Sequence, residues 1–352
     1  MDATAHLQSP AVTVVIASHD HRAQLLEALG GLTRQIGSDF SEFEVVVVLD
    51  GCSDGTAAAL RGFPTPFSLT IIEQVRTGLA AARNRGLAAA RGKIALFLDD
   101  DVIPGEHLVA AHRSLHEPLS NLVVLGEITH STKKRSSWDA YDDAMREKRQ
   151  TALRTSEEPS GIHSARNLSV RRDLAQAMGG FRGHLPGNQE VELGYRLRQA
   201  GTRFEFSHEA TVEDSGQSDY AAWKERQSTR GKLDVATYDQ SPDGQGLERL
   251  LACFNERNAL GRIVVAAMLR HRRLAPPVMR WAEDIAALTY AIRLAGLSRA
   301  AYSVIANTLY WSGVRDSLRG NKAFFSGLKA ARRSPALARL RIPQEEARPA
   351  AR

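Results

Sequence analysis

The chain has 352 residues, of which 43% are hydrophobic and 24% are charged. This composition is typical of a globular protein and excludes a largely disordered chain. Its two cysteines are too few for a disulfide framework, and no apolar run approaches the ~20 residues that a membrane-spanning helix needs. The first ten residues are polar and contain no signal-peptide core, so we expect a cytoplasmic protein.

Charges are unevenly distributed along the chain. The net charge is +6, but residues 262–352 hold 17 lysines and arginines against 5 acidic residues. The residues before them are therefore net acidic. This difference predicts different surroundings for the two parts of the chain.

Strand and helix patterns alternate over the first hundred residues. Four apolar, mostly β-branched runs predict buried strands, at residues 12–17, 43–49, 69–73 and 94–98. Leucines at helical spacing or alanine-rich stretches fill the intervals between them. Such alternation with short connections predicts a parallel sheet with right-handed crossovers.

Acidic residues follow three of these predicted strands. Asp20 comes shortly after the first strand, Asp50 directly after the second, and Asp99–Asp101 directly after the fourth. The carboxyl ends of parallel strands meet at one edge of the sheet, where ligands bind in open α/β folds. Carboxylates are ligands that Mg²⁺ and Mn²⁺ prefer, and these ions accompany phosphates. The pattern predicts a nucleotide and metal site; the alternative is three unrelated turns or helix caps.

The predicted elements change in character further along the chain. Further strands are predicted at residues 122–128, 166–172 and 202–206, and further helices at residues 133–154, after Asp173 and at 190–199. From residue 220 onward helical segments dominate. The expected organisation is an α/β region over 1–216, a mainly helical region over 217–335 and a disordered tail over 336–352.

Six short segments carry distinctive motifs. They read VVIASHD at 14–20, VVLDGCSDGT at 47–56, GLAAARNRG at 78–86, DDD at 99–101, NLSVRRDLAQAMGGF at 167–181 and QEVELGYRL at 189–197. In this order and on these predicted elements, they resemble the motifs of the family 2 glycosyltransferases with the GT-A fold. The resemblance covers about residues 10–216, and the three aspartates match the family's DxD motif.

The resemblance implies an α/β fold, a GT-A nucleotide-binding sheet with flanking helices, and an inverting, metal-dependent transferase. A sugar would move from a nucleotide diphosphate donor, of the UDP or dTDP type, to an acceptor hydroxyl. Matching positions imply Glu190 as the base that takes the hydroxyl proton. They imply nucleotide contacts from Ser18, Asp20, Asp50, Arg83 and Asp99, sugar or acceptor contacts from Arg166, Asn167 and Glu192, and ligation of Mn²⁺ or Mg²⁺ by Asp99, Asp101 and Asp214.

Two departures from the family pattern concern the reacting groups. Glu190 stands where the family usually has an aspartate, and Gln189 replaces the acid before it. Asp214 stands where the family usually has a histidine that can ligate the metal, and His208 is a nearby competitor for that role. These changes leave open a relative that binds a nucleotide sugar without turnover. A sugar nucleotidyltransferase is a further alternative, although residues 18–22 lack the glycine-rich loop it would need.

The partners follow in part from the resemblance and in part from charge. The resemblance implies a hydroxyl acceptor, which could be a polysaccharide, a lipid or a small molecule. Basic amphipathic helices in 262–352 suggest peripheral contact with an anionic membrane, the alternatives being a solvated face or a dimer contact. Nucleic acid is not expected, because aromatic residues are sparse in the basic region and no recognition motif is present.

Overall fold

The structure, a computed structural model, describes residues 9–117, 119, 121–130, 136–155, 162, 164–215, 219–240 and 244–331. The predicted tail over 336–352 lies outside the described residues. The chain forms two compact units. Unit 1 comprises residues 1–132, 150–184 and 189–216, and unit 2 comprises residues 133–149, 185–188 and 217–352.

Unit 1 is built on an eight-stranded sheet with the order β3-β2-β1-β4-β7-β6-β8-β5. Its strands are β1 (Val12–Ser18), β2 (Phe43–Asp50), β3 (Ser68–Gln74), β4 (Ile94–Asp99), β5 (Val102–Pro104), β6 (Leu122–His130), β7 (Asn167–Arg171) and β8 (Arg203–Asp214). The first four strands are parallel, as predicted. In the second half β7 runs antiparallel to β4 and β6, and β5 runs antiparallel to β8, so the sheet is mixed.

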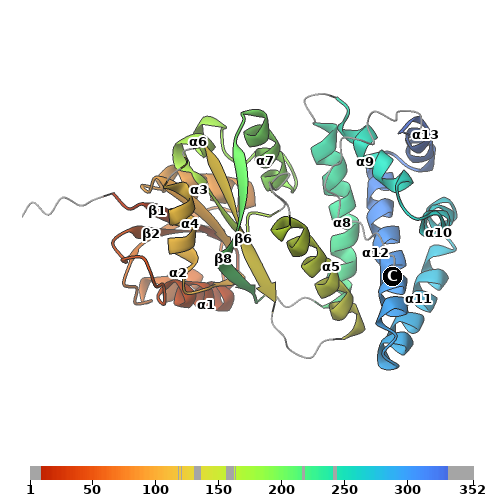
Figure 1. Ribbon diagram of the computed structural model, residues 1–352, viewed down its shortest axis with the longest axis horizontal. Helices are drawn as coiled ribbons and strands as arrows, with labels where there is room; N and C mark the ends of the chain where they lie inside the picture. The colour runs from red at the N-terminus through yellow and green to blue at the C-terminus, as the bar shows by residue number, and fades with distance from the viewer. Residues whose placement is uncertain are drawn as a thin grey trace, which may run out of the picture. The chain divides into compact units, whose positions relative to one another are not determined.

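Helices cover both faces of this sheet (Figure 1). They are α1 (Arg22–Leu32), α2 (Thr56–Arg61), α3 (Leu79–Ala89), α4 (Leu108–His116), α6 (Arg172–Ala177) and α7 (Gln189–Gln199). Alternate residues of a strand enter different cores, as the pleat requires. Ile16 packs with α1 and α4 in one core, whereas Val15 packs with α3 and α7 in the other.

Strand register aligns the ends of β1, β2 and β4 at one edge. Ser18 pairs with Leu49 of β2, and Ala17 pairs with Asp99 of β4. Each of these strands is buried along nearly its whole length and ends at a polar residue. The edge therefore collects Ser18, Asp50 and Asp99. For Asp50 and Asp99 this is the convergence that the sequence predicted from parallel strands.

Unit 2 is helical. It contains α8 (Tyr220–Asp239), α9 (Gly246–Asn255), α10 (Ala259–Arg270), α11 (Ala275–Ala291), α12 (Ala295–Ser317), α13 (Asn321–Ala331) and most of α5 (Ser137–Arg154). Helix α12 packs against α8 and α11 (Figure 1). Its approach to α8 needs glycine, because a Cβ on Gly313 would lie 2.0 Å from the carbonyl oxygen of Ser228. Within the described residues, no helix has both the length and the apolarity to cross a bilayer.

Candidate active site

Asp50 is the most firmly held acid at the sheet edge. Its carboxylate accepts hydrogen bonds from the backbone N–H of Thr77 at 2.7 Å and of Gly78 at 2.8 Å, and from the Gln74 amide at 2.9 Å. Burial alone would raise the pKa of Asp50, but these donors outweigh it and the pKa lies below its usual value. Asp50 is therefore ionised, and its lone pairs not used by these donors can accept further bonds.

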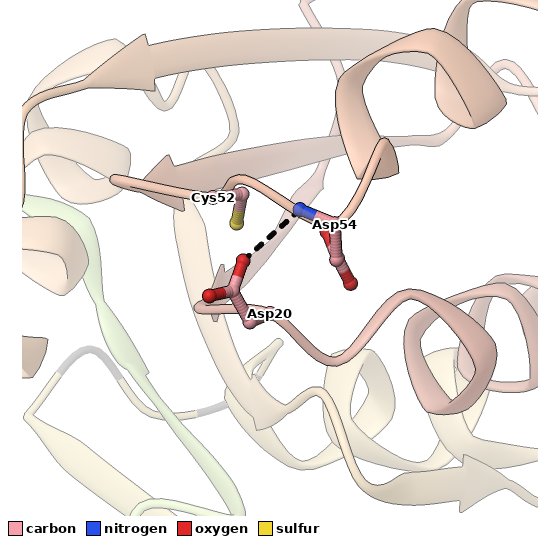
Figure 2. A group of neighbouring side chains, drawn as sticks. All are labelled: Asp20, Cys52 and Asp54. Carbon is pink, nitrogen blue, oxygen red and sulfur yellow. Dashed lines mark hydrogen bonds between the residues drawn. The ribbon is translucent and has the colours of Figure 1, made fainter.

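Asp20 fastens the loop after β1 to the loop after β2. Its Oδ1 accepts from the backbone N–H of Ser53 at 2.6 Å and of Asp54 at 3.3 Å, the second of which Figure 2 shows. Among the described residues, Asp20, Cys52 and Asp54 form the one group whose possible metal-ligand atoms all lie within 4.8 Å of one another. Burial raises the pKa of the Cys52 thiol, so it is protonated and is a poor ligand for Mg²⁺ or Mn²⁺.

The three consecutive aspartates at the end of β4 have different partners. Asp99 accepts from Nη2 of Arg83 at 2.7 Å, and Asp101 accepts from Nη2 of Arg166 at 2.9 Å. Asp100 is buried and lies 3.2 Å from Nδ1 of His21. Burial raises the pKa of Asp100, with His21 acting against it. Asp100 therefore differs from Asp99 and Asp101 in lying beside a histidine and not beside an arginine.

Asp214, at the end of β8, completes the acidic cluster. Pairing of Val102 with Asp214 between β5 and β8 brings this residue beside the turn after β4 that holds Asp101. Both of its carboxylate oxygens accept from Arg166, at 2.9 Å and 2.8 Å. His208, the competitor considered from the sequence, is instead exposed and lies 3.4 Å from Glu127.

The carboxylates of this cluster suit a divalent cation chemically, but their ligand atoms do not all lie within 4.8 Å of one another, and a guanidinium lies among them. Asp99, Asp101 and Asp214 offer the hard oxygen atoms that Mg²⁺ and Mn²⁺ require. Three N–H···O bonds already join Asp101 and Asp214 to Arg166. Burial would lower the pKa of Arg166, but the bond to Asp214 and the charges of Asp101 and Asp99 outweigh it and raise that pKa. Arg166 therefore stays charged. A metal ion could bind both Asp101 and Asp214 only if the Arg166 side chain moves away from them.

Glu190 lies in the first turn of α7, close to the acids of β4. Its Oε2 is 3.7 Å from Nη1 of Arg83, whose Nη2 bonds to Asp99. Arg83 is buried, and its Nη1 has no hydrogen-bond partner among the residues that the structure describes. Burial raises the pKa of Glu190, with Arg83 opposing that shift. A carboxylate with a raised pKa is a better proton acceptor near neutral pH than an ordinary glutamate.

Glu192 has a different environment from Glu190. Both of its oxygens accept from Arg196, at 2.8 Å and 2.7 Å, and Arg182 lies 3.1 Å away. Arg196 also donates to the carbonyl oxygens of Met178 and Gly180. These bonds tie α7 to the loop after α6, which makes Glu192 a structural anchor in this arrangement.

Asn167 lies beneath the site, and it is only 2% exposed. Its Nδ2 donates to the carbonyl oxygens of Glu127 and Ala210, and its Oδ1 accepts from Nε2 of His112 at 2.8 Å. All the polar atoms of the amide are thereby used inside the fold. Ser18 is also buried, and its carbonyl oxygen accepts the weak bond of the Cys52 thiol.

Comparison with known proteins shows which proteins this chain is similar to. The sequence model of "Glycosyl transferase family 2" matches residues 13–179. Glycosyltransferase AglE of Haloferax volcanii is 27% identical over 57% of this chain and 65% of that protein. The chain matches only part of each of three curated relatives. The matched part is 29% to 65% of the relative's own length.

Solved glycosyltransferases share the fold. The mannosyltransferase PcManGT from Pyrobaculum calidifontis, in complex with GDP-Man and Mn²⁺, matches 86% of this chain and 87% of that chain, with a TM-score of 0.52 and 20% identity. TarS 1-349 from S. aureus, in complex with UDP-GlcNAc, matches 92% of each chain, with a TM-score of 0.54 and 14% identity. The described sheet and the neighbours' likeness show a GT-A-like fold. The family model that this chain matches, over residues 13–179, is that of glycosyl transferase family 2.

Proposed function

We propose that the chain is an inverting glycosyltransferase that moves a sugar from a nucleotide diphosphate to an acceptor hydroxyl, with Glu190 as the base. The observation that carries this proposal is that Arg83 contacts both acids: it donates a hydrogen bond to Asp99 and lies 3.7 Å from Glu190. One side chain thus links the acid at the nucleotide edge to the proposed base. A displacement at a bound donor needs this closeness of leaving-group site and base.

The proposed step balances one proton and one bonding pair. Glu190 takes the proton of the acceptor hydroxyl while that oxygen attacks the anomeric carbon opposite the diphosphate. The new C–O bond forms as the bond to the diphosphate breaks, and the bonding pair leaves with the phosphate oxygen. Nη1 of Arg83, which makes no hydrogen bond within the described part of the chain, can donate to the charge that develops on that phosphate.

A divalent cation is part of the proposal. Asp101 and Asp214, with help from Asp99, would hold Mn²⁺ or Mg²⁺, which would neutralise charge on the diphosphate. The Mn²⁺ in the complex of the Pyrobaculum mannosyltransferase supports such use of metal. Asp50 would accept from the N–H of uracil or thymine, which favours a UDP or dTDP donor. Neighbours hold GDP-Man or UDP-GlcNAc, so the base of the donor is a matter for experiment.

The proposal is tested by measuring nucleotide release from a panel of UDP, dTDP and GDP sugars. Each sugar is tried with Mn²⁺ or Mg²⁺ and with hydroxyl acceptors. The proposal is supported if the parent hydrolyses the donor or transfers its sugar and the Glu190→Gln variant does neither. The exposed Glu106 provides the control substitution, Glu106→Gln. Donor binding by the parent without release under any of these conditions would instead establish a non-catalytic nucleotide-sugar-binding protein.

We also propose that unit 2 contacts an anionic membrane through α11 and the turn that follows it. Trp281, Ile285, Leu288 and Ile292 recur at helical spacing and are 51% to 73% exposed. Soluble proteins rarely expose so many large apolar side chains on one helix. Exposed arginines lie nearby in the sequence, at positions 273, 280, 293 and 299. Apolar insertion beside basic residues fits a surface of anionic lipid. The cytoplasmic location stays a prediction from the sequence.

A further inference from the structure

Arg166 occupies the centre of the cluster that the sequence assigns to a metal ion. It directly precedes β7, whose Asn167 pairs with Leu98 of β4, so its side chain starts beside the end of β4. Asp214 reaches the same place through the pairing of β8 with β5. Acids from two separate parts of the chain therefore converge on a single guanidinium.

The guanidinium contacts each of the three acids. Nη1 donates to Asp214 at 2.9 Å, and Nη2 donates to Asp214 at 2.8 Å and to Asp101 at 2.9 Å. Nε lies 3.6 Å from Asp99. The pairing with Asp214 is bidentate, which is the strongest geometry that arginine forms with a carboxylate. These contacts leave Arg166 with 21% of its side chain exposed.

We propose that Arg166 is a built-in cation that competes with divalent metal for Asp101 and Asp214. The inference rests on the proposed function only in naming these two acids as metal ligands. A metal ion must break three charge-assisted bonds before it can bind both carboxylates, and it then faces a displaced positive charge. Free Mn²⁺ therefore binds the parent weakly, and removal of the guanidinium strengthens that binding.

Metal binding without any donor tests the inference. Free Mn²⁺ is measured by electron paramagnetic resonance during titration of the full chain, and Mg²⁺ binding by calorimetry. Arg166→Met removes the charge and keeps much of the volume, and we expect it to tighten Mn²⁺ binding by about tenfold or more. Adding Asp214→Asn to that variant should return the affinity to the parent's weak value. Unchanged or weaker Mn²⁺ binding by Arg166→Met overturns the inference.

A matched arginine separates this effect from a general loss of ion pairs. Arg196 also makes a bidentate pair, with Glu192, at a distance from the DxD acids along the chain. Arg196→Met should lower the melting temperature and leave Mn²⁺ affinity unchanged. An equal gain in Mn²⁺ affinity in Arg196→Met would contradict a specific role for Arg166.

Thermal unfolding gives a second readout that needs no activity. Arg166→Met removes the three bonds that Arg166 donates to Asp101 and Asp214, so it should melt at a lower temperature than the parent in the absence of metal. Millimolar Mn²⁺ should raise the melting temperature of this variant more than that of the parent. The opposite order would overturn the inference.

If Arg166→Met does not fold even with Mn²⁺, Arg166→Lys decides the question. Lysine keeps the positive charge but cannot make the bidentate pair with Asp214. Fewer bonds to the two acids must then break, so Mn²⁺ should bind this variant more tightly than the parent. Equal or weaker binding by Arg166→Lys contradicts the inference. Because none of these measurements uses a donor, a parent that transfers no sugar would refute the proposed function and leave this result standing.

Discussion

The Nη1 atom of Arg83 lies 3.7 Å from Oε2 of Glu190, while Nη2 of the same side chain bonds to Asp99. Arg83 can therefore influence both the ionisation of the proposed base and the charge at the nucleotide edge. The spacing of Glu190 from this arginine is longer than a hydrogen bond. Arg83 therefore does not occupy the carboxylate of Glu190 with a hydrogen bond, in contrast to Glu192, which is bonded to Arg196.

Glu190→Gln should lower the rate of transfer by about 10²–10⁴-fold, because an amide cannot accept the hydroxyl proton. Donor affinity, measured by calorimetry, should change little. Glu192→Gln should have the opposite profile, with a lower melting temperature because Arg196 and Arg182 lose a charged partner. A Glu190→Gln variant that transfers sugar at the parental rate would exclude Glu190 as the base.

The acid side of the pH–rate profile should report the raised pKa of Glu190. The base acts only when ionised, so kcat/KM should fall with decreasing pH at a higher pH than an ordinary glutamate would give. Arg83 opposes the rise in this pKa, so Arg83→Gln should move the acid limb to still higher pH. If the acid side of the pH–rate profile lies at the same pH in Arg83→Gln as in the parent, the coupling of Arg83 to Glu190 is contradicted.

Much of the site could be predicted because it depends on parallel strands. The register that aligns Ser18, Asp50 and Asp99 follows from the alternation of strands and helices. The partner of the DxD acids could not be predicted in the same way. It depends on the antiparallel direction of β7 and on the three-residue strand β5, and neither leaves a hydrophobic pattern that could be recognised. The resemblance therefore implies only a sugar or acceptor contact for Arg166.

Asn167 provides a case in which a motif position and its environment differ. The resemblance suggested a contact with the sugar or acceptor, whereas the structure uses every polar atom of the amide within the fold. Asn167→Ala should therefore lower the free energy of unfolding by about 2–4 kcal/mol, since it leaves buried partners without a bond. Chemical denaturation measures this loss. An unchanged unfolding free energy with a raised KM for the acceptor would favour the direct contact.

His112 and His116 should make the fold sensitive to mild acid. Both side chains are buried and share the hydroxyl of Ser169. Burial lowers the pKa of His112 to about 4 and, with the charge of neighbouring groups, that of His116 to about 3. The unfolded chain takes up these protons near its ordinary histidine pKa of about 6.5, and the folded chain does not. Stability is therefore fully present above that pH and is lost as the pH falls toward 4.

The change is measurable as the slope of unfolding free energy against pH. Each histidine contributes up to about 1.4 kcal/mol per pH unit below its unfolded pKa. His112→Gln should reduce the slope between about pH 6 and pH 5, even if it lowers stability at pH 7.5. A variant with the parental slope would show that other groups cause the acid sensitivity.

The exposed face of α11 gives a prediction that is independent of the catalytic site. The double substitution Trp281→Ser and Leu288→Ser should lower co-sedimentation with vesicles containing anionic phosphatidylglycerol by at least about tenfold, because it removes two large apolar side chains from the binding face. Val75, which is 82% exposed in unit 1, provides the control Val75→Ser, which should bind like the parent. Binding should also weaken with added salt and with neutral vesicles, because the nearby arginines attract anionic lipid. A different outcome would contradict the membrane proposal. In it, the parent self-associates in sedimentation velocity without lipid, and the double variant is monomeric yet binds vesicles like the parent. The exposed face of α11 would then be a contact between copies of the chain.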